Sequence, residues 1–510
     1  MRKMFGFLAA FLCGVMLLTG CGGGGAGGEK NPEKKEGAKK HITMALFWLD
    51  KSLEPAEEWN GWSLARAGAS ETLTTINDKL ELTPLLADKW ENIDPLTWKI
   101  HIRKGVKFSN GKALTPEEVK KSIERAVKKD KRAADNAKLD SITVDGENII
   151  YKTKEPYGAL MYNLSEPLFT IIDTDKSDAE IAKGPVTTAP YMVTSFQPGE
   201  VMELAANPNY WGGKPGLDRL TVKLIKDDNT RAMALQSGEI DIAQKLDPAG
   251  AKMFKGKEGF NTLEVPSLRL EFAFLNLKHP FLGNANVRKA MSLAVDRDAM
   301  AKVFGGEACG TVFPAAAGCG FDQLDRQHFN LAEAKQLLAK EGFADTNGDG
   351  VVEKDGQPFE VNLQIFKRTP IPETLQAQLA QAGIKVNINF VEDTQDNLNK
   401  GNFDMSLNSY ITAVTGDTQR ILEQNFTTNG ADNYGKYSNP AFDEVMAKMS
   451  REFDQKKRKD LTVEAQKILL QDNPYLFLVS GKTVIVSKSN VKNLKKYPLD
   501  YYLIDKDVTN

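Results

Sequence analysis

The sequence predicts a fold of strands and helices that is divided into two or three lobes. Trp98, Ile100 and Ile102 alternate with polar residues at the strand period of two, and a capped helix is indicated from Thr115 onward. About 470 of the 510 residues follow a polar stretch near the N-terminus. A chain of that length is too long for a single hydrophobic core, so more than one lobe is expected.

The first twenty residues have the features of an export signal. Arg2 and Lys3 precede an apolar run from 5 to 18, which is too short to span a membrane comfortably as a helix. We therefore predict that 1–20 is a signal peptide, with an N-terminal membrane helix as the alternative. The four residues that end at Cys21, Leu-Thr-Gly-Cys, resemble a bacterial lipobox, which implies cleavage before Cys21 and a diacylglycerol anchor on its thiol.

The segment 21–40 is predicted to be a flexible, lipid-anchored leash. It is rich in glycine, lysine and glutamate, and it has no core-forming residue beyond its alanines. The folded part is expected to begin near His41, where the letters HITMALFW give a candidate buried strand.

The charge and the cysteines are typical of an exported protein that does not bind nucleic acid. There are 66 lysines and arginines against 68 aspartates and glutamates, so the basic excess of a nucleic-acid-binding protein is not found. No second apolar run approaches the length of a membrane helix, so we expect only the lipid anchor to touch the membrane. Cys309 and Cys319 favour a disulfide in an exported protein, with two free thiols as the alternative.

Aromatic residues and an arginine share one face of the helix predicted after residue 59. Trp59, Trp62 and Arg66 fall at positions i, i+3 and i+7. Indole rings and a guanidinium plane can clamp a flat or cationic solute, so this face is a candidate wall of a ligand cleft. Core packing beside a surface arginine explains the same pattern, and both interpretations stay open.

The block from 81 to 127 is the most specific stretch of the chain. The Asn-Gly pair at 110–111 supplies the positive φ of a tight hairpin, and Thr115 with Pro116 and two acids opens a helix. The order of PLLADKW, an aromatic strand and IRKGVKFSNGKALTPEEV resembles the signature of extracellular solute-binding protein family 5. These are ABC-importer proteins that carry peptides, nickel and related chelates.

This resemblance extends over nearly the whole chain after His41, with further matches at 207–215 and 237–241. It implies an α/β, two-lobed periplasmic-binding-protein-like fold of type II with an extra inserted subdomain. The implied segments after the leash are lobe I (41–72, 190–283 and 482–510), an inserted subdomain of lobe I (73–189) and lobe II (284–481). The chain then crosses twice between the lobes, and a solute held between them stabilises the closed form.

The family's role follows from the same resemblance. It implies a lipoprotein that captures a small solute and delivers it to the permease and ATPase subunits of an ABC importer. We expect the protein to be exported and lipid-anchored to the cell membrane, facing the periplasm or the outer surface. We also expect a monomer that has no catalytic residues and requires no cofactor.

Enzyme motifs are not found in the sequence. The chain has four histidines and lacks His-Glu-x-x-His, Cys-x-x-Cys, Gly-x-Ser-x-Gly and phosphate-binding glycine loops. An exported hydrolase that uses scattered carboxylates stays as an alternative class. A scaffold or adhesion protein is a third class, and the repeats expected of it are not found.

Departures from two ligand templates of the family bear on the solute. In the peptide carriers an aspartate, three residues before an Asp-Pro pair, holds the peptide's amino group. Here Asp417 matches the acid of that pair, and Val414 stands where the amine-binding aspartate should be, which would leave an ammonium group unpaired. The nickel carriers use arginine and tryptophans, and Arg132 aligns with one such arginine, whereas Glu166 and Thr412 stand in place of an arginine and a tryptophan.

We therefore predict a nickel or other metal chelate as the solute, with a dipeptide or oligopeptide as the alternative. The predicted ligand-binding residues are Trp59, Trp62, Arg66 and Arg132 on one wall and Tyr410, Thr412 and Asp417 on the other.

One further motif suggests a structural calcium ion. Asp345, Asn347, Asp349 and Glu353 stand at positions 1, 3, 5 and 9 of a calcium-binding loop, with a glycine at position 6. The twelfth position, where such loops carry a bidentate acid, is also glycine. The same residues make a polar hairpin turn without metal, so both interpretations stay open.

Overall fold

The structure is a computed structural model that describes residues 40–510. The predicted signal peptide, the lipid anchor on Cys21 and the leash up to residue 39 lie outside the described residues, so they stay predictions. Within 40–510, the helices are too short or too polar to cross a bilayer.

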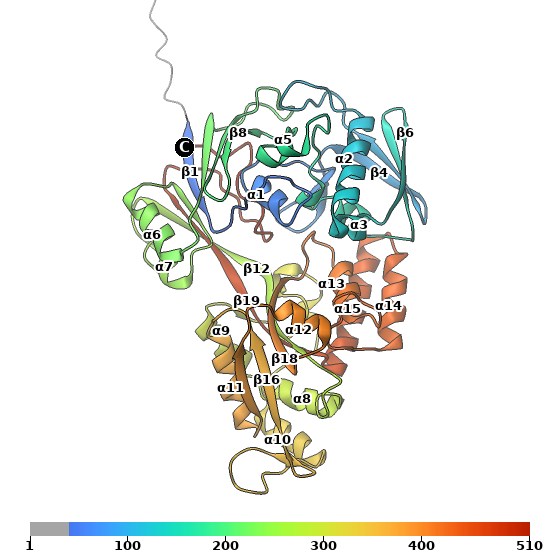
Figure 1. Ribbon diagram of the computed structural model, residues 1–510, viewed down its shortest axis with the longest axis vertical. Coiled ribbons are helices and arrows are strands. Elements are labelled where there is room, and N and C mark those ends of the chain that lie inside the picture. Colours follow the sequence, from blue (N-terminus) through green and yellow to red (C-terminus); the bar gives the residue numbers. More distant parts are fainter. Residues whose placement is uncertain (1–39) are drawn as a thin grey trace, which may run out of the picture. The chain divides into compact units, whose positions relative to one another are not determined.

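A large mixed sheet runs through the described chain (Figure 1). It has 11 strands. In spatial order they are β17 (Lys385–Phe390), β16 (Glu360–Ile365), β18 (Met405–Ile411), β12 (Phe260–Leu275), β19 (Tyr475–Lys488), β11 (Ile242–Gln244), β1 (His41–Leu46), β10 (Arg219–Leu224), β9 (Val201–Ala206) and β8 (Tyr191–Gln197), with β13 (Glu307–Ala308) beside β19. β1 is parallel to β10 and β11, and β16 is parallel to β17 and β18, whereas the other pairs are antiparallel.

Two long strands, β12 and β19, join the two halves of this sheet. One half consists of β17, β16 and β18, and the other consists of β11, β1, β10, β9 and β8. The first half of β12 pairs with the end of β19, and the second half of β12 pairs with the start of β19. The register shifts between Pro266 and Leu270. Proline has no N–H to donate to the ladder, and a bulge there changes the direction of nearby side chains. Ser267 and Arg269 lie within this break.

A second, antiparallel sheet carries the block from 81 to 127. Its strands in spatial order are β4 (Ala87–Asp94), β5 (Thr97–Ile102), β7 (Asn148–Thr153) and β6 (Leu139–Asp145). Helix α2 (Pro116–Lys129) follows Thr115, whose side-chain oxygen accepts a hydrogen bond from the Glu118 backbone N–H at 3.3 Å. The strand predicted at 98–102 and the capped helix are therefore confirmed.

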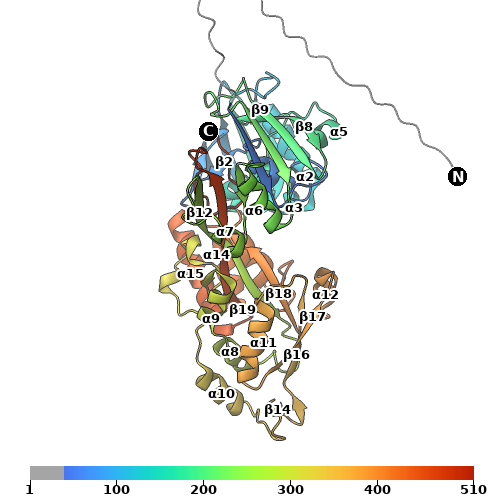
Figure 2. The same ribbon diagram turned by 90° about the vertical axis from the view of Figure 1, so that its left-hand side faces the viewer.

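The remaining helices are mostly short segments between strands, and Figure 2 shows those around the lower half of the sheet from the side. They are α1 (Asn60–Arg66), α3 (Lys131–Ala137), α4 (Leu160–Asn163), α5 (Asp178–Lys183), α6 (Asp228–Ser237), α7 (Pro248–Lys252), α8 (Ala285–Leu293), α9 (Arg297–Phe304), α10 (Leu331–Lys340), α11 (Ile371–Gln381), α12 (Thr394–Lys400), α13 (Gln419–Phe426), α14 (Pro440–Ser450) and α15 (Gln455–Asp472). Two small hairpins complete the fold, β2 (Thr74–Ile76) with β3 (Leu82–Pro84) and β14 (Glu353–Lys354) with β15 (Gln357–Pro358).

The predicted lobe boundaries can be placed on these elements. The range 73–189 carries all the strands of the smaller sheet, and 284–481 carries helices α8 to α15. The boundary at 481/482 falls inside β19, which belongs to both halves of the large sheet. The division into lobes therefore stays a prediction.

The two cysteines correct one prediction, because they are buried free thiols. The Cys309 thiol donates to the Thr311 carbonyl at 3.3 Å, and the Cys319 thiol donates to the Ala317 carbonyl at 3.2 Å. The predicted disulfide is therefore wrong, and the alternative of two free thiols holds. Burial raises the pKa of Cys319 to about 12, which keeps this thiol protonated.

A buried carboxylate, Glu71, lies beside the family's sequence match at 207–215. Glu71 is 4% exposed and accepts hydrogen bonds from the Thr188 hydroxyl at 2.7 Å, the Trp211 indole at 3.0 Å and the Tyr210 hydroxyl at 3.2 Å. Burial outweighs these donors and raises the pKa of Glu71 from 4.5 to about 7. Between about pH 4.5 and 7, the native protein therefore keeps a proton on this carboxyl, whereas the unfolded chain has released it.

This difference predicts a pH-dependent stability. Because the native pKa of Glu71 lies above its unfolded value, its contribution is full below pH 4.5 and is lost as pH rises to about 7. The loss amounts to about 3 kcal/mol, at 1.36 kcal/mol for each pKa unit. Glu71→Gln should abolish this pH dependence in the free energy of unfolding, measured by urea titration between pH 4.5 and 8. Equal pH slopes for the wild type and the variant would contradict the assignment.

Candidate ligand-binding cavity

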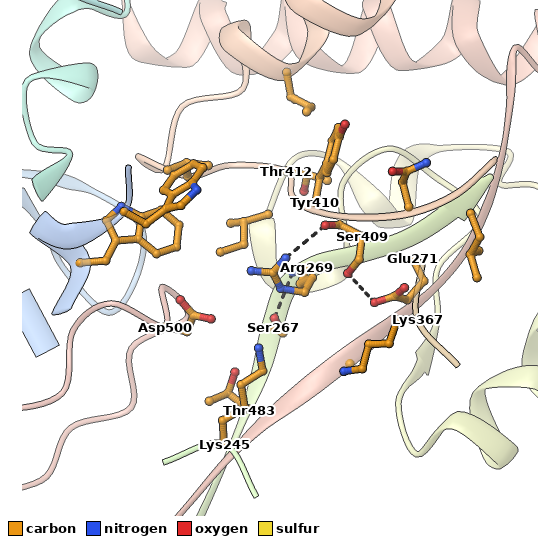
Figure 3. A pocket seen from close by; sticks show the side chains of 18 of the residues that line it. Lys245, Ser267, Arg269, Glu271, Lys367, Ser409, Tyr410, Thr412, Thr483 and Asp500 are labelled. Atoms are coloured by element: carbon orange, nitrogen blue, oxygen red, sulfur yellow. Dashed lines mark hydrogen bonds between the residues drawn. The ribbon is translucent and has the colours of Figure 1, made fainter. Parts of the chain in front are cut away.

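A cavity of about 750 Å³ lies where the two halves of the large sheet meet. Its volume is within the range of about 300–1,000 Å³ that is usual for small-molecule sites. Both halves contribute to its wall (Figure 3). The lining residues that matter here are Trp59, Trp62, Arg66, Lys245, Ser267, Arg269, Glu271, Lys367, Ser409, Tyr410, Thr412, Val414, Asp417, Arg420, Asp432, Tyr434 and Asp500.

The predicted aromatic wall is present. Trp62 lies in α1, and Trp59 is the residue that immediately precedes this helix. Both line the cavity. Their rings meet edge to face with centroids 4.7 Å apart, and Trp62 also packs on Tyr501 at 4.9 Å. The two interpretations of this face are therefore compatible, because Trp62 belongs to the core and borders the cavity.

Arg66 also lines the cavity, but its charge is already matched. Its guanidinium donates to the Asp500 backbone carbonyl at 3.0 Å and to the Asp500 carboxylate at 3.3 Å. Burial favours a higher pKa for Asp500, but the positive charges of Arg66, Arg269 and Lys245 outweigh it and lower this pKa. Arg66 and Asp500 therefore form a buried ion pair at the edge of the site.

Arg132 corrects another prediction, because it is not among the residues that line the cavity. Its guanidinium lies 3.8 Å from the centroid of the Trp59 ring, and its Nη1 is 3.5 Å from the carboxylate of Glu166. Glu166 is fully buried and also binds Arg420 at 3.1 Å. The buried acid holds Arg132 behind Trp59, where it supports the aromatic wall instead of facing a solute.

The predicted residues of the opposite wall line the cavity, with different degrees of freedom. Asp417 binds Arg458 at 2.6 Å and accepts a hydrogen bond from the Gln419 backbone N–H at 2.8 Å, so its charge is matched. The Thr412 hydroxyl donates to the Leu268 carbonyl at 3.2 Å. Tyr410 also lines the cavity, and its ring can contact a solute there.

Three cations that the sequence analysis did not single out face the cavity: Lys245, Arg269 and Lys367. Within residues 40–510, no carboxylate oxygen lies within 4.0 Å of their side-chain nitrogens. Arg269 donates to the Ser409 backbone carbonyl at 3.1 Å, which directs its guanidinium across β18. In the sequence Arg269 alternates with leucines like any residue on the wet face of a strand, so no local signal distinguished it.

Lys245 is held in an unusual backbone conformation beside this group. Its φ is +57°, in the region that non-glycine residues seldom occupy, and its ammonium lies 4.3 Å from the centroid of the Phe47 ring. Burial, and then repulsion from Arg269, Arg66 and Lys367, lower the pKa of Lys245 to about 8, against the attraction of Asp500. An incoming anion would therefore stabilise its charged form.

Two acids in the cavity also lack a cationic partner within the described chain. Glu271 accepts a hydrogen bond from the Ser409 hydroxyl at 2.5 Å, and burial raises its pKa. Asp432 accepts a hydrogen bond from the Tyr434 hydroxyl at 2.8 Å. The cavity can thus hold a solute that carries carboxylates together with N–H groups, with the cations in excess.

No histidine or cysteine occurs among the described residues that line the cavity. Imidazole and thiolate are the protein ligands that suit late transition metals. A metal of that kind would therefore have to enter this cavity with ligands of its own.

A ligand cavity between two halves of a sheet that share only two long strands defines a solute-binding protein of the hinged, two-lobed type. Residues 81–433 match the family described as bacterial extracellular solute-binding proteins, family 5 (middle), and the chain belongs to this family. Members of this family deliver solutes to ABC importers. The predicted family and the two-lobed α/β fold class are confirmed.

Particular relatives carry different solutes. The chain is 27% identical to the nickel-binding protein NikA of Staphylococcus aureus, over 98% of each chain, and 28% identical to the oligopeptide-binding protein AppA of Bacillus subtilis, over 85% of each. Among solved structures it resembles NikA from Brucella suis in complex with Fe(III)-EDTA, with a TM-score of 0.83 and 26% identity over 92% of this chain and 99% of that one. It also resembles S. aureus NikA in complex with Ni(L-His)2, with a TM-score of 0.75 and 26% identity over 92% and 99%.

Proposed function

We propose that the protein binds a metal chelate that carries carboxylate groups, such as nickel held by amino-acid ligands, and passes it to an importer. The observation that carries this proposal is the group of Lys245, Arg269 and Lys367, which face the cavity without carboxylate partners. Arg269 matters most, because a guanidinium plane can bind a carboxylate through two parallel hydrogen bonds.

The relatives support a chelate over a bare metal ion. Two of the similar structures hold Ni(L-His)2 and Fe(III)-EDTA, and in both complexes the organic part carries carboxylates. The cavity of this chain offers cations to such groups, and indole rings to their flat faces. Its lining has no imidazole or thiolate that would hold a metal ion by itself.

A peptide is the second candidate. The likeness to oligopeptide-binding AppA favours it, and Glu271 or Asp432 could accept a hydrogen bond from an amino group. Against it, Val414 lines the cavity at the place where the family's peptide carriers have an amine-binding aspartate. An ammonium group desolvated beside valine would lose its charge-assisted hydrogen bond.

Binding without turnover is the third part of the proposal, in preference to an exported hydrolase. The cavity acids Asp417 and Asp500 are each paired with an arginine, and the two acids without a cationic partner, Glu271 and Asp432, each accept a hydrogen bond from a neighbouring hydroxyl. The solute recovered after incubation should therefore have its original mass.

Arg269→Ala should weaken the binding of nickel with histidine by about 2 to 5 kcal/mol in calorimetric titration, because closure leaves a ligand carboxylate desolvated and unpaired. Arg269→Lys should lose less, since it keeps the charge but not the planar fork. Arg219→Ala is the matched control, an exposed arginine on β10 whose loss should change the affinity by less than about 0.5 kcal/mol.

The same titrations with a mixture of short peptides separate the candidates. If peptides bind and the nickel chelate does not, the chelate proposal is wrong and the importer assignment stands. An Arg269→Ala variant that binds the chelate as tightly as the wild type would show that the cations do not hold its carboxylates.

We also propose that Cys21 carries a lipid that anchors the protein outside the cytoplasm. Cys21→Ala should prevent lipidation and release the protein from the membrane fraction, as measured by fractionation and mass spectrometry. Retention of this variant in the membrane would mean that the apolar segment before residue 21 is itself the anchor.

A further inference from the structure

Oxygen-bearing side chains gather in the loop before the β14–β15 hairpin, at residues that do not line the solute cavity. One carboxylate oxygen from each of Asp345, Asp349 and Glu353 lies within 4.8 Å of the other two. Asn347 belongs to the same group, since its amide donates to the Asp349 carboxylate at 3.2 Å. Figure 2 shows β14 at the bottom of the view, below α10.

Glu353 distinguishes this group from an ordinary acidic surface. Its side chain is only 8% exposed, and its Oε2 accepts hydrogen bonds from the Thr346 backbone N–H at 2.8 Å and hydroxyl at 3.0 Å. Its Oε1 is buried and has no hydrogen-bond partner in the described chain. A buried carboxylate oxygen without a partner is unfavourable by several kcal/mol in general, so this oxygen is one that a bound cation would stabilise.

The protein itself supplies no cation to this cluster. Within residues 40–510, no lysine, arginine or histidine nitrogen lies within 4.0 Å of the three carboxylates. The nearby Lys354 points elsewhere, with its ammonium 5.5 Å from the centroid of the Phe343 ring. Three carboxylates this close to one another repel strongly unless a cation lies between them.

The loop backbone fixes the acids in place. The carboxylate of Asp345 accepts hydrogen bonds from the backbone N–H groups of Gly348 at 2.7 Å and Gly350 at 3.0 Å. The φ angles of Gly348 and Gly350 are +80° and +86°, which a side chain would disfavour. This network explains how the loop keeps its shape, but it leaves the free oxygen of Glu353 unexplained.

We propose that this loop binds one calcium ion through Asp345, Asn347, Asp349 and Glu353. Loops of this pattern add a backbone carbonyl at the seventh position, which is Val351 here. Glu353 then takes the part of the acid that is missing from the twelfth position. The donors are all oxygens, which suits calcium; magnesium requires a nearly ideal octahedron, and zinc favours nitrogen and sulfur.

The ion would stabilise one end of the lower half of the fold. Glu353 pairs with Ala344 across the loop, and the Val352 backbone N–H donates to the Gly383 carbonyl at 2.9 Å. Closing this loop with calcium therefore ties the segment after α10 to the segment after α11. The solute cavity is not touched, so calcium should raise the melting temperature and leave the solute affinity unchanged.

Calorimetric titration of the full chain, purified in detergent and freed of metal with EDTA, tests this proposal. Calcium chloride should bind at one site per chain with a Kd of about 10⁻⁴ to 10⁻³ M, the range of calcium sites in extracellular modules. Glu353→Gln should weaken binding at least tenfold. Asp345→Asn, at an exposed position, should do the same and serves if the Glu353 variant does not fold.

Asp355→Asn is the matched control, because it removes an exposed acid from the adjacent turn that is not part of the cluster. It should bind calcium like the wild type and show the same rise in melting temperature. The proposal is overturned if 10 mM calcium gives neither heat nor a thermal shift, if magnesium gives an equal shift, or if Asp355→Asn loses as much affinity as Glu353→Gln. None of these readouts depends on the solute.

Discussion

The antiparallel pairing of β12 with β19 is the constraint on which the rest of the structure depends. These two strands carry the chain between the halves of the large sheet, so the halves can move together only by bending this pair. The register break after Pro266 falls at the cavity and turns Ser267 and Arg269 toward it. A feature of the backbone thus positions both the hinge and the charge that we propose to hold the solute.

Charges around the cavity divide into those that stabilise the fold and those left for a ligand. Arg66 with Asp500 and Asp417 with Arg458 are matched, buried pairs, and each would leave an uncompensated charge if broken. Lys245, Arg269 and Lys367 have no carboxylate partner within the described residues, and burial, followed by repulsion from the neighbouring cations, lowers the pKa of Lys245. On our proposal, an anionic solute would stabilise these cations, and that gain would favour closure of the lobes around it.

The sequence allowed prediction where the signal is local or is a family mark. The strand at 98–102, the helix cap at Thr115 and the family itself were predictable in this way. The roles of Arg269 and Arg132 were not, because a strand arginine and a helix arginine look alike in sequence whether they face a solute or the buried Glu166. The disulfide prediction was wrong for a similar reason, since a spacing of ten residues does not determine which way each thiol points.

The central claim is that the cavity holds a metal with a carboxylate-bearing chelator. It is tested most directly by purifying the protein from its native host without added metal and analysing the released ligand by mass spectrometry beside elemental analysis of the protein. The account predicts about one transition-metal ion per chain at the solute site together with a small carboxylate-bearing molecule. A peptide released without stoichiometric metal would contradict it.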